Sequence, residues 1–77
     1  MGEELLGTLQ SYRQARRLLD ELAVQGGWEL VAQGPIPETD WSSVLYQKGD
    51  EELTLVMRSP RTWDVVKRRK GENVKVV

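Results

Sequence analysis

The sequence lacks both cysteine and histidine in all of its 77 residues. Without cysteine no disulfide can staple the fold, and without either residue type the usual ligand set of a structural zinc is missing. The same absences remove the commonest general base near neutral pH and the strongest nucleophile among the side chains. We therefore expect a protein that is not an enzyme and that has no catalytic residues, no metal site and no cofactor.

Long apolar runs are also missing, since no stretch reaches the ~18 residues that a membrane span needs. The opening Met1-Gly2-Glu3-Glu4 is acidic and lacks the basic start of a signal peptide. Together with the absent cysteines, this favours one domain over 1–77, in the cytoplasm and without a membrane partner. A chain this short buries only about 60% of its unfolded surface, so we expect a homodimer that completes its core.

Carboxylates are the remaining candidates for acid–base or metal chemistry. Glu38 and Asp40 flank a proline-rich loop, while Asp50, Glu51 and Glu52 crowd a turn without the ligand spacing of a calcium loop. We interpret both groups as solvated loop charges. An enzyme would need a deep pocket lined by Glu29, Glu38 or Asp40.

One long helix is predicted over 11–25. Ser11 and Gln14 form a capping box, and Gly26-Gly27 supplies the left-handed residue that ends a helix. The apolar residues recur at helical spacing on one face: Tyr12, Ala15, Leu18, Leu19, Leu22 and Ala23. The other face carries charges in which Arg16–Asp20 and Arg17–Glu21 are i,i+4 ion pairs.

Strands are predicted on both sides of the loop 34–40. In 28–33 the alternation puts Trp28, Leu30 and Ala32 on one face. A hairpin follows, with arms at 43–48 and 52–58 joined by Gly49-Asp50. Its core-facing residues under the helix are expected to be Val44, Tyr46, Leu53, Leu55 and Met57. Residues 4–10 are either a short first strand or a lead-in to the helix.

A short second helix is predicted over 60–70. Pro60 suits the first helical position, the last turn is cationic and Gly71 follows it. The alternative is a hairpin of strands 62–67 and 73–77, because Val65-Val66 is β-branched. Residues 73–77 form a last strand in either case. The expected fold class is α+β, a two-layer sandwich with an antiparallel sheet of three to five strands.

Charge is divided unevenly along the chain. Residues 58–77 hold seven bases and two acids (+5), whereas residues 1–57 hold four bases and ten acids (−6). A cationic cluster attracts phosphate or an acidic protein surface without regard to sequence. This predicts a nucleic-acid-binding or acidic-partner-binding patch made of Arg58, Arg61, Trp63, Lys67, Arg68, Arg69 and Lys70. The prediction requires these cations to share one water-facing surface and to be free of carboxylate partners.

Protein–protein contact is the alternative function. Trp41 follows an acidic, proline-rich loop, where it either packs on the core or anchors a partner protein. The predicted terminal strand at 74–77 has an edge that is available for pairing, and a two-fold dimer is the commonest closed assembly.

The run from Leu18 to Val31 resembles a family of small, mostly bacterial proteins whose helix ends in a phrase such as LNELGAEGWELV. The matching residues are Leu19, Glu21, Leu22, Gly27, Trp28, Glu29, Leu30 and Val31. The likeness covers roughly residues 11–48. This chain has one extra residue before the Gly-Trp step, lacks a clear first strand and adds the basic C-terminal third. The resemblance implies a small α+β fold and no particular activity, so it assigns no functional residues.

Overall fold

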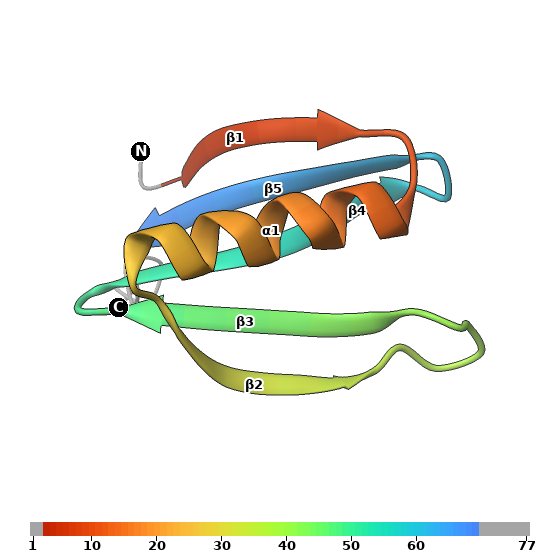
Figure 1. Cartoon of the computed structure of the whole chain (residues 1–77). Helices are drawn as coiled ribbons and strands as arrows, with labels where there is room; N and C mark the ends of the chain where they lie inside the picture. Colours follow the sequence, from red (N-terminus) through yellow and green to blue (C-terminus); the bar gives the residue numbers. More distant parts are fainter. Residues whose placement is uncertain (1–2, 70–77) are drawn as a thin grey trace, which may run out of the picture.

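The computed structural model describes residues 3–69, which form one helix and five strands. The elements are β1 (Glu3–Leu9), α1 (Tyr12–Gly26), β2 (Glu29–Pro35), β3 (Ser42–Lys48), β4 (Glu51–Ser59) and β5 (Thr62–Arg69). The strands make a single antiparallel sheet in the order β1-β5-β4-β3-β2. α1 lies across one face of that sheet (Figure 1), so the α+β class is confirmed.

The ends of α1 follow the local signals in the sequence. The backbone N–H of Gln14 donates to Ser11 Oγ at 3.2 Å, as a capping residue requires. At the other end Gly27 has a φ of 74°, and the N–H of Trp28 donates to the Ala23 carbonyl at 2.9 Å. A residue with a side chain would be strained at that φ, which explains the glycine in the Gly-Gly-Trp phrase.

The core lies between α1 and the strands beneath it. It is built from three small or branched residues of the helix and four of the sheet: Ala15, Leu19, Ala23, Val44, Leu53, Trp63 and Val65. α1 packs mainly on β1, β4 and β5, at one side of the sheet. On β1 the approach is close, because a Cβ at Gly7 would lie 2.9 Å from Cδ2 of Leu18. The β3–β2 side is therefore the part of the sheet that the helix covers least.

The central hairpin confirms the sequence prediction. β3 and β4 pair with Tyr46 opposite Leu53, and Gly49 in the turn has a φ of 60°. Opposed residues of an antiparallel pair share a face, so both point to the helix side, as expected. The possible first strand is also present, as β1.

The predicted second helix at 60–70 is wrong, because residues 62–69 form β5. Pro60 and Arg61 instead form a tight turn between β4 and β5, with Ser59 opposite Thr62. Proline is equally suited to the second position of such a turn, so the helix-start signal was ambiguous. β5 then pairs with β4 on one side and β1 on the other, which gives the β-branched Val65-Val66 step a central position. The strand expected at 73–77 lies outside the described residues.

The predicted faces of β2 need a second correction. Leu30 lies opposite Tyr46 and Ala32 lies opposite Leu45, with a register shift between them. Tyr46 and Leu45 are consecutive and point to opposite faces, so Leu30 and Ala32 do too. A β-bulge at this position breaks the simple alternation, which sequence periodicity assumes to be regular.

Candidate functional surfaces

The cationic residues of β5 are divided between the two faces of the sheet. Lys67 lies opposite Leu53, on the helix side, whereas Arg68 lies opposite Glu52, on the other side. The alternation of a strand has this effect, since consecutive side chains point to opposite faces. The change from helix to strand therefore alters how the residues of the candidate patch are arranged.

Arg58 is tied to a buried carboxylate. Its Nε donates to Asp64 Oδ2 at 2.7 Å, and Thr8 Oγ1 donates to Asp64 Oδ1 at 2.8 Å. The hydrogen bond from Arg58, followed by that from Thr8, lowers the pKa of Asp64 below its usual range. Asp64 is thus held ionised between β1 and β4, and the charge of Arg58 is largely compensated within the fold.

The cations further along β5 also have carboxylate partners. Lys67 Nζ lies 3.4 Å from a carboxylate oxygen of Glu4 and 3.9 Å from one of Glu51. Arg68 Nε donates to Glu52 at 3.2 Å. Exposed ion pairs of this kind add little stability, but they reduce the net positive field that a polyanion would meet.

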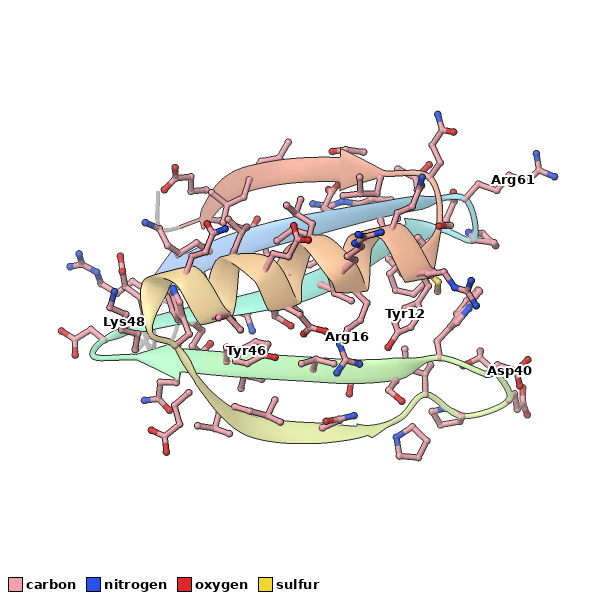
Figure 2. The ribbon with its side chains drawn as sticks, in the orientation of Figure 1. Tyr12, Arg16, Asp40, Tyr46, Lys48 and Arg61 are labelled. Atoms are coloured by element: carbon pink, nitrogen blue, oxygen red, sulfur yellow. The ribbon has the colours of Figure 1, made fainter. Side chains whose placement is uncertain are left out.

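Two of the predicted patch residues, Arg61 and Arg69, are exposed and have no ion-pair partner within residues 3–69. Arg61 projects from the turn between β4 and β5 (Figure 2), whereas Arg69 ends β5, so they lie at opposite ends of that strand. Lys70 lies outside the described residues. The cations that β5 and its turn provide are therefore not gathered in one place, and nucleic-acid binding stays a prediction with reduced electrostatic support.

Trp63 belongs to the core, because only 2% of its surface is exposed. Its ring lies edge-on to Tyr12 (5.2 Å between centroids) and to Trp41 (5.0 Å). Trp63, which the sequence prediction included in the cationic patch, is thus not accessible to a nucleic acid or an acidic partner. Trp41 is half-buried and also stacks on Tyr12 at 6.4 Å, so the aromatic trio covers one end of the core. Trp41 thus packs on the core through these two ring contacts, and part of its side chain is still accessible to solvent.

A polar network links α1 to β3. Tyr46 Oη donates to Asp20 Oδ1 at 2.8 Å, Arg16 Nε donates to both Asp20 oxygens at 3.1 Å, and an Arg16 terminal nitrogen donates to Tyr12 Oη at 3.1 Å. Figure 2 shows Arg16, Tyr12 and Tyr46 on this side of the helix. Burial, and then the hydrogen bond to Asp20, raise the pKa of Tyr46 above its ordinary value. These hydrogen bonds connect four polar side chains between the helix and the sheet.

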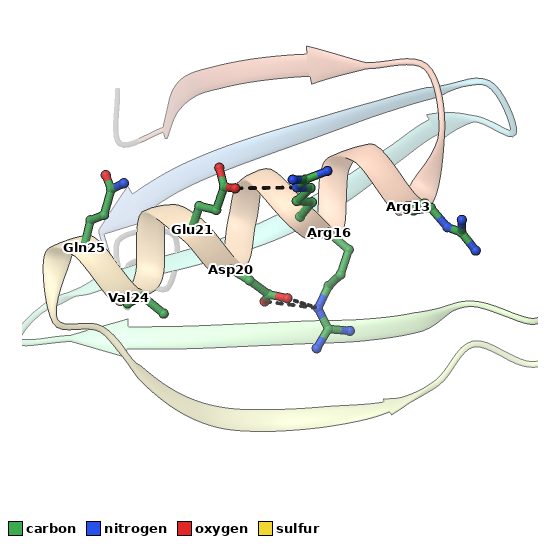
Figure 3. A pocket seen from close by; sticks show the side chains of 7 residues that line it. Arg13, Arg16, Asp20, Glu21, Val24 and Gln25 are labelled. Carbon is green, nitrogen blue, oxygen red and sulfur yellow. Dashed lines mark hydrogen bonds and ion pairs between the residues drawn. The ribbon is translucent and has the colours of Figure 1, made fainter.

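A shallow depression runs along the outer side of α1 (Figure 3). Its charged residues are mostly paired within the helix, as Arg16–Asp20 at 3.1 Å and Arg17–Glu21 at 3.5 Å, which confirms the two predicted i,i+4 pairs. Arg13 is exposed beside them. Among residues 3–69, its cations are largely paired and no buried polar side chain lines it, so this surface is weak as an anion site.

The carboxylates considered above do not converge. Glu38 and Asp40 are exposed in the loop between β2 and β3, and Asp50 is exposed in the next turn. In the described part of the chain, no group of three or more Asp or Glu side chains is placed to hold a metal ion. The helix of residues 12–26 is neither long nor apolar enough to cross a membrane.

The outer strand β2 is the surface that sequence reasoning missed. All of its residues except Gly34 are exposed, including Leu30 (46%) and Val31 (44%). Only one residue of this strand, Glu29, is charged. The other outer strand, β1, carries Glu3 and Glu4. Edge strands expose unpaired backbone N–H and C=O groups, and charged side chains are one of the means by which proteins protect them, so β2 is the edge that is less protected by charge.

The described fold is thus an α+β domain with a five-stranded antiparallel sheet, one covering helix and one apolar outer strand. Comparison with known proteins adds no relative, since no family model, no curated protein and no solved structure matches the chain.

Proposed function

We propose that this chain is a small, non-enzymatic binding protein of the cytoplasm that acts by pairing the outer edge of β2 with an extended segment of another polypeptide. The observation that carries the proposal is the exposure of β2 along almost its whole length, with Leu30 and Val31 nearly half exposed. Adding a strand to such an edge satisfies its backbone groups, and side chains on the two faces then supply specificity.

The position of α1 supports this choice. The helix packs mainly on β1, β4 and β5 and reaches only β3 on the other side, so a new strand beside β2 would not collide with it. Leu30 points to the same face as Tyr46 and the helix, at the open side of the domain. A partner strand would therefore cover apolar surface as well as satisfy hydrogen bonds, which is the main source of affinity in such contacts.

The test uses the absence of cysteine from the chain. A Gln33→Cys variant carries a single thiol on β2, to which a short photo-crosslinker is attached. Gln25→Cys is the matched control, because it replaces another exposed glutamine, on α1. After irradiation in an extract of the source cells, polypeptide adducts are expected from position 33 and not from position 25.

A second change in the same chain makes the result specific. Val31→Lys adds the kind of charge that blocks edge pairing, on a residue that is already exposed. We expect it to abolish the adducts at position 33 while leaving the circular dichroism spectrum unchanged. Equal adducts at both thiols, or none at position 33, would reject the proposal.

Nucleic-acid contact through the cationic residues is the rival proposal. It predicts binding that weakens steeply with salt and is lost when Lys67, Arg68, Arg69 and Lys70 are all replaced by alanine. It has less support, because Arg58, Lys67 and Arg68 are paired with carboxylates and Trp63 is buried.

A further inference from the structure

The two faces of the sheet differ in what covers them. α1 lies on one face (Figure 1), and every other element of residues 3–69 is a strand of the sheet itself. The face away from α1 is called the open face below. An antiparallel sheet with one solvated face usually carries polar residues on that face. The residues of the open face therefore indicate whether water or another part of a polypeptide covers it.

An apolar row crosses the open face from one outer strand to the other. The register of the strands places one residue of each strand side by side, in the order Leu5, Val66, Thr54, Leu45 and Ala32. Val65 on β5 and Val44 on β3 belong to the core under α1, so their neighbours Val66 and Leu45 point to the open face. Four of the five residues in this apolar row are hydrophobic, which is not the pattern of a solvated face.

A second row of side chains borders the apolar row, nearer to the end of β5. It is mostly charged and consists of Glu3, Arg68, Glu52, Gln47 and Glu29. On the opposite border lie Thr8 and Asp64, which are joined by a hydrogen bond. The apolar row is therefore a narrow strip between polar groups.

Val66, in the strand between β1 and β4, is the most deeply buried member of the apolar row. Only 1% of its surface is exposed, whereas Leu5 beside it in the outer strand is 59% exposed. Val66 is not part of the core cluster under α1, so the helix does not account for this burial. The composition of the row and the burial of Val66 both favour a face that is covered.

We propose that residues 70–77, which follow β5 directly, cover the apolar row of their own chain. Three of these eight residues are valines: Val74, Val76 and Val77. In an extended backbone Val74 and Val76 point to the same side, so both face the row while Lys75 faces water. The inference concerns the open face and does not depend on the proposed use of the β2 edge.

The length and the starting point of this segment suit the proposal. β5 ends at Arg69, three residues or about 10 Å beyond Val66. Eight residues reach about 26 Å when extended, whereas the distance from β5 to β2 is only about 14 Å for strands about 4.8 Å apart. Gly71, the second residue after β5, has the conformational freedom that a reversal of the chain over the sheet requires.

The small size of the apolar row favours an attached segment over a separate partner. A strip with one residue from each strand is small beside the roughly 800 Å² that each partner of a stable complex buries. A segment of the same chain needs no such area, because a short linker gives it an effective concentration in the mM range. A contact that is too weak to hold a free peptide is then occupied most of the time.

Thiol reactivity at two adjacent valines tests the proposal in the full chain, which has no cysteine. Val66→Cys places a thiol on the open face and Val65→Cys places one under α1, both at buried positions (1% and 0% exposed). Each is combined with Val74→Ser/Val76→Ser. We expect this double change to accelerate alkylation of the thiol at position 66 by iodoacetamide about tenfold or more, because its local protection is lost. The thiol at position 65 should stay slow.

Lys75→Ser is the matched control, since it changes the residue between the two valines and should alter neither rate. An unchanged rate at position 66 after Val74→Ser/Val76→Ser would overturn the proposal. An equal rise at positions 65 and 66 would also overturn it, because the whole domain would then have loosened instead of one face.

A photo-crosslinker on a Val76→Cys variant provides a second measurement that leaves the apolar row intact. We expect adducts within one chain, mapped by mass spectrometry to peptides that contain Val66, Thr54 or Leu45. Adducts on α1 would overturn the proposal. Adducts that join two chains would overturn the assignment of the segment to its own chain, and neither result would affect the test of the β2 edge.

Discussion

Replacement of Trp63 tests whether this side chain is structural. The indole is 2% exposed, makes edge-on contacts with two aromatic rings and lies with Nε1 3.4 Å from the Pro60 carbonyl oxygen. Truncating a buried tryptophan to alanine costs about 3–5 kcal/mol through lost transfer free energy and the cavity left behind. Each lost aromatic pair adds about 0.5–1.5 kcal/mol. We therefore expect Trp63→Ala to lower the free energy of unfolding by about 4 kcal/mol or more.

That loss is large for this chain. A stability of about 0.05–0.15 kcal/mol per residue gives only about 4–12 kcal/mol for a protein of this length. Trp63→Ala could therefore unfold the domain, so Trp63→Phe provides a second point, with an expected loss of about 1–2 kcal/mol because most of the ring contact is kept. Trp41→Ala is the matched comparison, since Trp41 belongs to the same aromatic trio but is only half-buried.

The assay is urea unfolding followed by circular dichroism, which does not depend on the tryptophans being replaced. The expected order of stability is wild type, Trp63→Phe, Trp41→Ala and then Trp63→Ala. If the free energy of unfolding of Trp63→Ala is within about 1 kcal/mol of the wild-type value, the side chain does not occupy the core. In that case Trp63 would be accessible for stacking on a base.

Two further predictions concern the ion pair of Asp64 and the close approach of α1 to Gly7. Because Arg58 lowers the pKa of Asp64, this carboxylate stabilises the fold above its unfolded pKa of about 4 and ceases to do so as pH falls through its folded pKa. Asp64→Asn should thus be less stable than the wild type at pH 7, and urea midpoints of the two should approach each other below pH 4; a constant difference would contradict this. In the same assay Gly7→Ala should lower the free energy of unfolding by about 1–2 kcal/mol, because the added Cβ meets Leu18. Gly34→Ala is the control, since it has open space around it and should change that free energy by no more than about 0.5 kcal/mol. Equal effects of the two substitutions would show that α1 does not approach β1 closely.

The local elements of this fold were predictable from sequence. The capping box at Ser11, the left-handed Gly27 and the Gly49 turn each place a backbone feature within a few residues. These signals are short-range, so they act in the same way whatever the rest of the chain does. They account for the correct prediction of α1 and of the β3–β4 hairpin.

The errors arose where long-range pairing decided the outcome. Ser59-Pro60 is compatible with either a helix start or a tight turn, and the choice depended on whether residues 62–69 found partners in the sheet. They pair with β1 and β4 together, and this outweighs the local helix signal. The cationic patch was predicted from charges that are adjacent in sequence. In the structure, strand alternation places these charges on opposite faces, and carboxylates from β1 and β4 form ion pairs with them.

The candidate surface on β2 could not be predicted from the sequence for a related reason. An outer strand differs from an inner one by its neighbours, which the sequence of 29–35 does not reveal. The bulge at Val31 left no glycine or proline signal beside it. Its one sequence indication is the lack of charge between Leu30 and Pro35.

The pairing of β1 with β5 also has a consequence during synthesis. The hydrogen bond from Thr8 to Asp64 joins positions 56 residues apart, while β2, β3, β4 and β5 follow one another as neighbours. β1 leaves the ribosome first but has no place in the sheet until β5 has emerged. Since contacts between distant residues form late, the nascent chain is expected to carry β1 as an unattached arm until translation has passed residue 69.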